Sequence, residues 1–276
     1  MRTASDARNP IVLPKGPENI GFHRRGGCRK AADGNVHSTL SSLFYMQART
    51  SGIRSPAMTP PPGKPAVLLD RDGTLVEEID YLKDPAQLRL IAGAAAAVRR
   101  LNEAGVPVII ITNQSMIARG MGTEADLALI HERLITLLQA EGARIERIYY
   151  CPHHPDIGVP PYRATCDCRK PLPGLLSRAA VDLDLDLSRS TMIGDSLRDL
   201  EAGDAAGCRR LILVRTGHGA AEEPKTTAAK LGHRAIIHDD LAAAVDYLLQ
   251  QETRAQRDTA DRPIRAQSPS PKPRHA

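Results

Sequence analysis

The chain has 276 residues, of which 42% are hydrophobic and 25% charged, which is typical of a soluble globular protein with one or two domains. The net charge of +5 arises at the two ends, because residues 65–250 carry 21 basic and 26 acidic side chains and have a net charge of −5. This distribution disfavours a nucleic-acid partner for the folded part, and the absence of any apolar run of ~20 residues disfavours a membrane partner.

Both ends of the chain lack the periodicity of packed secondary structure. Residues 1–64 are rich in Gly, Pro, Ser and Arg, and residues 251–276 are polar and Pro-rich, so we predict a disordered N-terminal extension and a disordered C-terminal tail. An Arg-rich start is found in targeting peptides, but no apolar segment accompanies it here. An appendage, or translation that begins at Met58, is the simpler interpretation.

Between these ends, residues 65–250 predict one α/β domain. Strands are predicted at 66–69, 106–111, 145–150, 191–193 and 211–214, with an edge strand at 235–237. Helices are predicted at 93–104, 123–140, 174–183, 197–206 and 241–249, whereas 216–233 predicts no clear element. Strands that alternate with helices indicate right-handed crossovers, and so a doubly wound parallel sheet covered on both faces.

Polar side chains follow three of these strands at the point where each ends. Asp70 and Asp72 come directly after the first strand, Thr112 and Asn113 end the second, and Asp195 follows the strand at 191–193. The carboxyl ends of parallel strands meet at one edge of a sheet, so we expect these five side chains to converge. Two adjacent carboxylates repel each other unless they share a cation or have different roles. Any one of these signatures alone also fits an ordinary turn.

A cysteine and histidine pattern lies in the long irregular segment at 151–173. Cys151 and His153 precede Cys166 and Cys168 by a loop of twelve residues, which provides the three thiolates and one imidazole of a closed tetrahedral zinc site. The alternative is three buried structural cysteines and a surface histidine. His154 is a weaker candidate, because adjacent residues rarely reach one metal ion.

The remaining cysteines and the residues after the cluster complete this prediction. Cys28 and Cys208 lie outside the pattern, and the odd count of five cysteines favours a reducing, cytoplasmic setting over a disulfide framework. Arg169 and Lys170 directly follow the last cysteine of the cluster. Held by a rigid loop, these two cations could meet an anionic substrate, although a solvated surface pair is the ordinary alternative.

Several motifs together resemble one known family. They are D-R-D-G-T at 70–74, T-N-Q-S at 112–115, I-A-R-G at 117–120, Y-Y-C-P-H-H-P at 149–155, C-D-C-R-K-P at 166–171 and G-D-S-L-R-D at 194–199. The set resembles the haloacid dehalogenase-type (HAD-like) phosphatases, and within them the D-glycero-D-manno-heptose 1,7-bisphosphate phosphatases, with the histidinol-phosphatase domain as a close relative. The resemblance covers residues 65–217 and implies a HAD-like fold with a minimal cap and a zinc-binding loop.

The resemblance implies a role for each matching residue at the sheet edge. Asp70 would be the nucleophile that forms an aspartyl phosphate, and Asp72 would be the general acid and base. Mg²⁺ would be held by Asp70, Asp195 and the carbonyl oxygen of Asp72. Thr112 and Asn113 would bind the transferring phosphoryl group.

The resemblance also implies residues that neutralise charge and residues that bind the substrate. Lys170 would offset the charge of the nucleophile, and Arg119 and Arg169 would bind the substrate. Asp199 would orient the metal shell, unless it is an exposed helix acid. The family loop reads S-G-I-A-R-G, whereas Met116 stands at its glycine position. If that glycine has a positive φ or lets the substrate approach, Met116 would distort the loop.

The function implied is Mg²⁺-dependent removal of the C7 phosphate from D-glycero-D-manno-heptose 1,7-bisphosphate, a step toward lipopolysaccharide, by a cytoplasmic monomer that also binds Zn²⁺. The alternative enzyme is a phosphatase of histidinol phosphate or another small metabolite. A non-catalytic, zinc-stabilised binding module is disfavoured, because all four of the expected catalytic and magnesium residues are present, namely Asp70, Asp72, Lys170 and Asp195.

Overall fold

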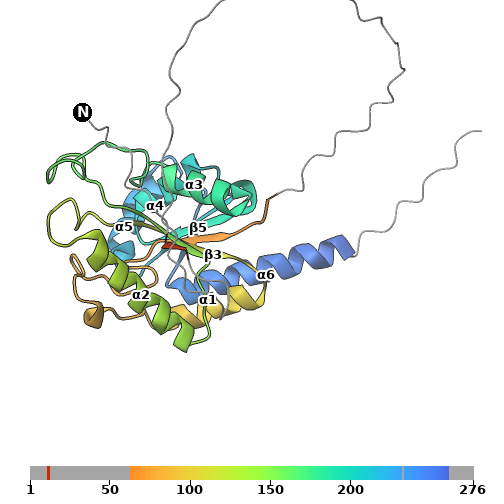
Figure 1. Ribbon diagram of the computed structural model, residues 1–276. Coiled ribbons are helices and arrows are strands. Elements are labelled where there is room, and N and C mark those ends of the chain that lie inside the picture. The colour runs from red at the N-terminus through yellow and green to blue at the C-terminus, as the bar shows by residue number, and fades with distance from the viewer. Residues whose placement is uncertain (1–10, 13–62, 232, 261–276) are drawn as a thin grey trace, which may run out of the picture. The chain divides into compact units, whose positions relative to one another are not determined.

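A seven-stranded sheet organises the part of the chain that the computed structural model describes, residues 11–12, 63–231 and 233–260 (Figure 1). The strands are β1 (Ile11–Val12), β2 (Val67–Leu69), β3 (Val108–Asn113), β4 (Arg147–Cys151), β5 (Thr191–Gly194), β6 (Arg210–Val214) and β7 (Ala235–His238). Their order is β1-β4-β3-β2-β5-β6-β7, and all pairings are parallel except that of β1 with β4. The parallel sheet predicted from the sequence is confirmed.

The order of the strands reverses in the middle of the sheet. The chain runs outward from β2 through β3 to β4, then returns to place β5 against the other side of β2, with Leu69 beside both Ile110 and Ile193. Parallel α/β sheets bind ligands at such a reversal, outside the carboxyl ends of the strands. Asp70 and Asp195 follow the two strands that meet there.

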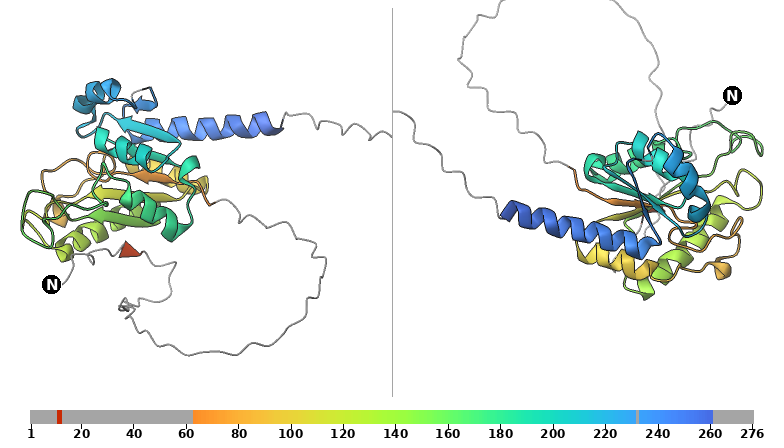
Figure 2. Two further views of the ribbon diagram at one scale, coloured as in Figure 1. Left: turned by 90° about the horizontal axis from the view of Figure 1, so that it is seen from above. Right: turned by 180° about the vertical axis from the view of Figure 1, so that it is seen from behind.

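Helices cover both faces of the sheet (Figures 1 and 2). The helices are α1 (Ala94–Glu103), α2 (Glu124–Ala140), α3 (Gly174–Leu183), α4 (Leu197–Ala205), α5 (Gly219–Ala228) and α6 (Leu241–Ala260), with short 3₁₀ turns at Pro85–Gln87 and Leu187–Arg189. Alternate residues of each strand point to opposite faces. Val67 and Leu69 therefore pack with α1, α2 and α6, whereas Leu68 packs with α3 and α4.

The structure differs from the sequence-based expectations at two helices. Helix α5 lies in the segment for which no element was predicted, where Pro224 and small side chains hide the helical pattern. Helix α6 continues past the predicted end at Leu249, so the expectation of disorder is wrong for residues 251–260. This extension is rich in Gln, Glu, Arg and Ala, which favour helix without needing a core-facing stripe.

The predicted N-terminal extension contributes strand β1, in which Ile11 stands opposite Ile148 of β4. Residues 1–10, 13–62 and 261–276, which hold the rest of the two predicted disordered ends, lie outside the described residues. The described residues form a single structural unit. None of the helices in this part of the chain combines the length and apolar character that a bilayer crossing requires.

Candidate active site

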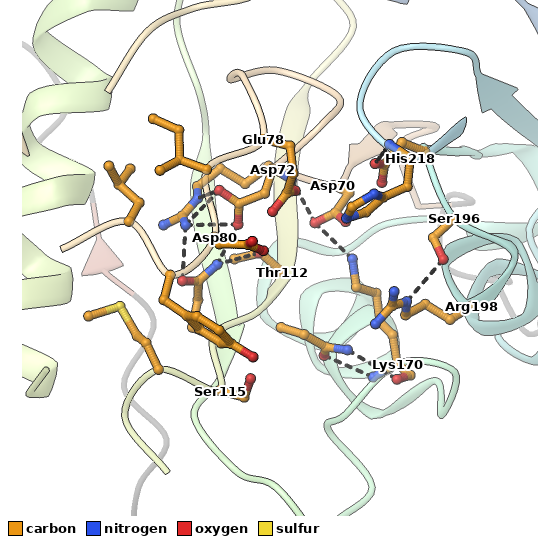
Figure 3. A pocket seen from close by; sticks show the side chains of 18 residues that line it. Asp70, Asp72, Glu78, Asp80, Thr112, Ser115, Lys170, Ser196, Arg198 and His218 are labelled. Carbon is orange, nitrogen blue, oxygen red and sulfur yellow. Dashed lines mark hydrogen bonds and ion pairs between the residues drawn. The ribbon is translucent and has the colours of Figure 1, made fainter. Parts of the chain in front are cut away.

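A pocket of about 220 Å³ opens at the carboxyl ends of β2, β3 and β5 (Figure 3). Six residues predicted from the sequence line it: Asp70, Asp72, Thr112, Asn113, Lys170 and Asp195. They come from four separate segments of the chain, which the parallel sheet brings to one edge. The expected convergence of polar side chains at this edge is therefore present in the structure.

The Lys170 ammonium lies between two carboxylates at the floor of this pocket. Its Nζ is 2.9 Å from Oδ1 of Asp70 and 2.7 Å from Oδ1 of Asp199, and it donates to the carbonyl oxygen of Ile111 at 2.7 Å. Burial lowers the pKa of Lys170, but the charges of Asp199 and Asp70 more than offset this, so the net shift is upward. Lys170 therefore stays charged.

Asp199 is a buried member of this cluster and not an exposed helix acid. It is fully buried, and its second oxygen accepts from the backbone N–H of Ser196, the N-cap of α4. One carboxylate thus caps a helix and neutralises part of the Lys170 charge. These two contacts account for the presence of a carboxylate at position 199, one helical turn after Asp195.

Asp195 is packed against two glycines that allow the backbone to approach it closely. A Cβ atom on Gly73 or Gly217 would lie 2.1 or 2.3 Å from Oδ2 of Asp195, and both glycines have positive φ. Oδ2 also accepts from the backbone N–H of His218 at 2.8 Å. Burial, and then the charges of Asp70 and Asp199, raise the pKa of Asp195 to about 8.

This cluster of acids fits a divalent cation. Ligand oxygens of Asp70, Asp195 and Asp199 lie within 4.8 Å of one another, and the Lys170 ammonium forms ion pairs with two of these carboxylates, Asp70 and Asp199. When all three are ionised, one ammonium leaves two negative charges uncompensated, and the raised pKa of Asp195 reflects its burial and this repulsion. Mg²⁺ carries two positive charges and prefers carboxylate oxygens, so the donor set matches its chemistry.

The Asp72 carboxylate is held beside Asp70 by two side chains. Arg71 donates to Oδ1 through Nε at 3.0 Å and through Nη2 at 2.8 Å, and Gln114 Nε2 donates to Oδ2 at 2.8 Å. Asp72 is not one of the clustered acids that could share the cation through a carboxylate. Its carboxyl group is therefore placed for a role other than metal binding.

The two polar residues at the end of β3 are engaged differently. Thr112 is buried and its Oγ1 accepts from Gln114 at 2.9 Å. Asn113 uses its amide to bind the backbone N–H and carbonyl of Lys170, each at 3.1 Å. Asn113 therefore ties the segment that carries Lys170 to the sheet, a function the sequence did not indicate.

The four residues of the predicted zinc site lie together. The Cys151 sulfur is 3.6 Å from that of Cys166 and 3.2 Å from that of Cys168. His153 Nδ1 is 3.4 Å from the Cys168 sulfur and 3.8 Å from the Cys151 sulfur. Zinc bonds of about 2.0–2.3 Å in tetrahedral geometry separate ligand atoms by about 3.6–3.8 Å, close to these distances.

The ionisation of these thiols also favours a bound cation. The hydrogen bond with Cys151 lowers the pKa of Cys166 to about 2, and the same contact raises the pKa of Cys151 far above its ordinary value. A metal ion would allow all three thiols to ionise. His154 lies outside this cluster, and its Nδ1 accepts from the backbone N–H groups of Asp156 and Ile157.

The comparisons with known proteins agree with this geometry. A family model described as HAD-hydrolase-like matches residues 167–244. A D-glycero-beta-D-manno-heptose-1,7-bisphosphate 7-phosphatase from Yersinia pestis is 41% identical over 164 residues, which are 59% of this chain and 87% of that protein. The chain belongs to this family of HAD-like phosphatases. It is therefore an enzyme that hydrolyses phosphoric monoesters.

Two further relatives of this phosphatase extend the comparison. The protein of the same name from Photorhabdus laumondii is 39% identical over 185 residues, 66% of this chain and 96% of that protein. A solved structure of a D,D-heptose 1.7-bisphosphate phosphatase from B. bronchiseptica, in complex with magnesium and phosphate, is 37% identical with a TM-score of 0.61. That match covers 68% of this chain and 99% of the other.

The arginines of the phosphatase are distributed differently from the sequence-based expectation. Arg119 lies with its guanidinium carbon 4.9 Å from the ring centre of Tyr81, and Arg169 donates to the carbonyl oxygen of His153 at 3.1 Å. Neither belongs to the residues that line the pocket, whereas Arg198 at the start of α4 does. Arg198 belongs to the motif at 194–199, but an exposed arginine on a helix gave no reason to assign it a role in the site.

The one departure from the family loop is accommodated. Met116 is buried at 2% exposure, lines the pocket and packs in the core beside α2. It is not among the described residues with positive φ. The strain that a methionine would suffer at a position requiring glycine geometry is therefore absent here.

Proposed function

We propose that this phosphatase removes the C7 phosphate from D-glycero-D-manno-heptose 1,7-bisphosphate, with Asp70 as nucleophile and Asp72 as general acid and base. The observation that carries the proposal is the placement of both carboxyl groups at the floor and wall of one pocket, beside the charged Lys170. The substrate is inferred from the relatives that share the fold and motifs.

The two carboxyl groups divide the hydrolysis into two steps. An oxygen of Asp70 attacks phosphorus, the bond from phosphorus to the sugar oxygen breaks, and the leaving oxygen takes a proton from Asp72. Asp72 then accepts a proton from water as that water attacks phosphorus, which releases inorganic phosphate and restores Asp70. A covalent intermediate replaces one difficult step with two easier ones.

The charges around Asp70 suit this reaction. Phosphoryl transfer depends mainly on positioning and on neutralising the charge of the transferring group. Lys170 provides one fixed cation. We assign Asp70, Asp195 and the carbonyl oxygen of Asp72 as holders of Mg²⁺, which supplies further neutralisation of the phosphoryl oxygens when it is bound.

The cysteine and histidine cluster has a structural part in this proposal. Zinc at Cys151, His153, Cys166 and Cys168 would close the loop that ends at Lys170. Asn113 anchors the same backbone from the sheet side. The cation beside the nucleophile would then be held from two directions.

A substrate panel tests the proposed function. Heptose 1,7-bisphosphate, heptose 7-phosphate, heptose 1-phosphate and histidinol phosphate are assayed with Mg²⁺, and kcat/KM is compared. The bisphosphate is expected to have the highest value, with release of the C7 phosphate. A higher kcat/KM for histidinol phosphate would move the substrate assignment to amino-alcohol phosphates. If none of the phosphomonoesters is hydrolysed, the proposed function is refuted.

A further inference from the structure

A buried arginine lies directly behind the Asp72 carboxylate. Arg71 is 1% exposed, and its guanidinium donates to both Asp72 oxygens through Nη2 at 2.8 Å. The remaining directions of the guanidinium are also engaged, since Nη2 is 3.0 Å from Gln114 Oε1 and Nη1 is 3.3 Å from His131 Nε2. Arg71 itself lines the pocket next to Asp72, and its guanidinium is held there by three side chains.

His131 supplies the contact farthest from the pocket. Arginine only donates hydrogen bonds, so Nε2 of His131 must be the acceptor and the ring proton must sit on Nδ1. This residue lies on α2, fully buried, in the helical stripe formed by Leu127, Ile130 and Leu134. Burial, and then the charge of Arg71, lower the pKa of His131 well below its ordinary value, which agrees with a neutral ring.

The histidine is a poor choice for packing alone. Its Nδ1 is buried without a hydrogen-bond partner among the described residues, and an unpaired buried donor opposes folding. An apolar side chain at this point of the stripe would bury the same surface without that cost. In return His131 makes the polar contact to Arg71, besides a ring contact with Tyr150 at 5.9 Å between centroids.

Gln114, the residue directly after β3, completes the arrangement. Its amide nitrogen donates to Asp72 and to Thr112 Oγ1, while its amide oxygen accepts from Arg71. The amide is therefore oriented by three partners at once. Arg71 and Gln114 both donate hydrogen bonds to the Asp72 carboxyl group. Arg71 is in turn held by His131 of α2, and Gln114 by Thr112 of β3.

We propose that Arg71, His131 and Gln114 are positioning residues that hold the Asp72 carboxyl where it can transfer protons to the leaving group and from water. The inference rests on the proposed function, which gives Asp72 these two proton transfers. The inference adds that helix α2 influences the rates of these two proton transfers through His131, which does not line the pocket. Misplacement of a reacting group by about 1 Å can cost about 100-fold in rate.

The test uses a leaving group that needs no proton. With p-nitrophenyl phosphate, formation of the Asp70 phosphate releases p-nitrophenolate without help from Asp72, whereas hydrolysis of the intermediate still needs Asp72. In the Mg²⁺-loaded enzyme, His131→Leu is expected to keep a burst of p-nitrophenolate within about threefold of wild type and to slow steady-state turnover by about 10- to 100-fold. His131→Gln, which keeps an acceptor, should recover most of the turnover.

The controls separate positioning from damage to the fold. Ile130→Val perturbs the same helix and should leave both burst and turnover unchanged. If His131→Leu reduces burst and turnover equally, changes neither, or is not rescued by His131→Gln, the inference is wrong. If His131→Leu does not fold, Arg71→Lys is used instead, because lysine keeps the positive charge but lacks the planar guanidinium that donates several hydrogen bonds at once. A retained burst with slowed turnover would again support the inference, and an equal loss of both would contradict it.

Failure of the proposed function would look different. Asp72→Asn should also keep the burst and lose turnover by about 10²–10⁴-fold. An Asp72→Asn enzyme with wild-type turnover would refute the role of Asp72 itself. Normal effects of Asp72→Asn together with an inert His131→Leu would refute only the positioning.

Discussion

The Lys170 ammonium lies 2.9 Å from Oδ1 of Asp70, although the two residues belong to a cysteine-rich loop and to the end of β2. The same ammonium contacts Asp199. The proposed nucleophile, the cation beside it and the loop that could hold zinc are therefore one connected structure, and a change in any of them should be detectable in the others.

Replacement of Lys170 by methionine should destabilise the metal-free protein strongly. It leaves the partly buried Asp70 and the fully buried Asp199 without their cation, and breaking a buried ion pair costs about 3–5 kcal/mol of unfolding free energy. Urea denaturation with EDTA measures this loss. The double variant Lys170→Met with Asp199→Asn should regain part of it, and an unchanged unfolding free energy for Lys170→Met would contradict the structure of the cluster.

Replacement of Asp70 by asparagine should abolish turnover while the fold is retained, because an amide cannot attack phosphorus as a carboxylate does. Acid quench of wild type during turnover should trap phosphate on the peptide that contains Asp70, identified by mass. Asp246→Asn, in an ion pair with Arg100 on the helices α1 and α6, is the matched control and should remain active. Phosphate on another residue would refute the assignment.

The contribution of Asp195 to the stability of the metal-free protein should fall as pH rises from about 4 to about 8, and comparison with Asp195→Asn separates it from the opposite contribution of His131. The folded pKa of Asp195 is raised from 3.8 to about 8, so its protonated form is favoured in the folded state and that stability is lost as pH rises through the folded value. Melting temperatures in EDTA measure the slope, which Asp195→Asn should flatten. Mg²⁺ should stabilise the wild type more at high pH, because its carboxylate ligands must be ionised.

Replacement of Cys166 by serine should lower zinc content and activity together. The loss of one thiolate weakens the closed site, and the loop that carries Lys170 then loses one of its anchors, while the contacts of Asn113 and of the Lys170 ammonium remain. Metal analysis and kcat are measured on the same preparation. Cys208→Ser, at a buried cysteine outside the cluster, should keep its zinc. Full activity in zinc-free Cys166→Ser would show that the loop orders itself without metal.

Replacement of Arg198 by glutamine should raise KM for a bisphosphate more than for a monophosphate. Arg198 lines the pocket, and in the described part of the chain its guanidinium has one hydrogen bond, from Nε to Ser196 Oγ, which leaves donors free for an anion. Steady-state kinetics on both substrates measure the difference. Arg169→Gln is the comparison, because Arg169 is bound to the backbone of His153, and a larger effect there would favour the original expectation for Arg169.

The linear sequence was enough to predict the parallel sheet and the polar side chains that gather at its edge. A strand buried on both faces must be apolar throughout, so runs such as Val67–Leu69 and Val108–Ile111 stand out. Asp70, Asp72 and Asp195 were found because each follows such a run, and the four zinc candidates because ligand spacing is local. These features depend on neighbours a few residues away.

Only the tertiary structure decided which side chains meet. The contact between Arg71 and His131 joins residues 60 apart in sequence, and the Lys170–Asp199 pair joins a loop to a helix cap. Arg198 enters the pocket because α4 begins beside it. Such contacts depend on how distant elements pack and which way each side chain then points. Hydrophobic periodicity assigns a residue to one face of its own helix or strand, but it does not identify the residue of another helix or strand that it will contact.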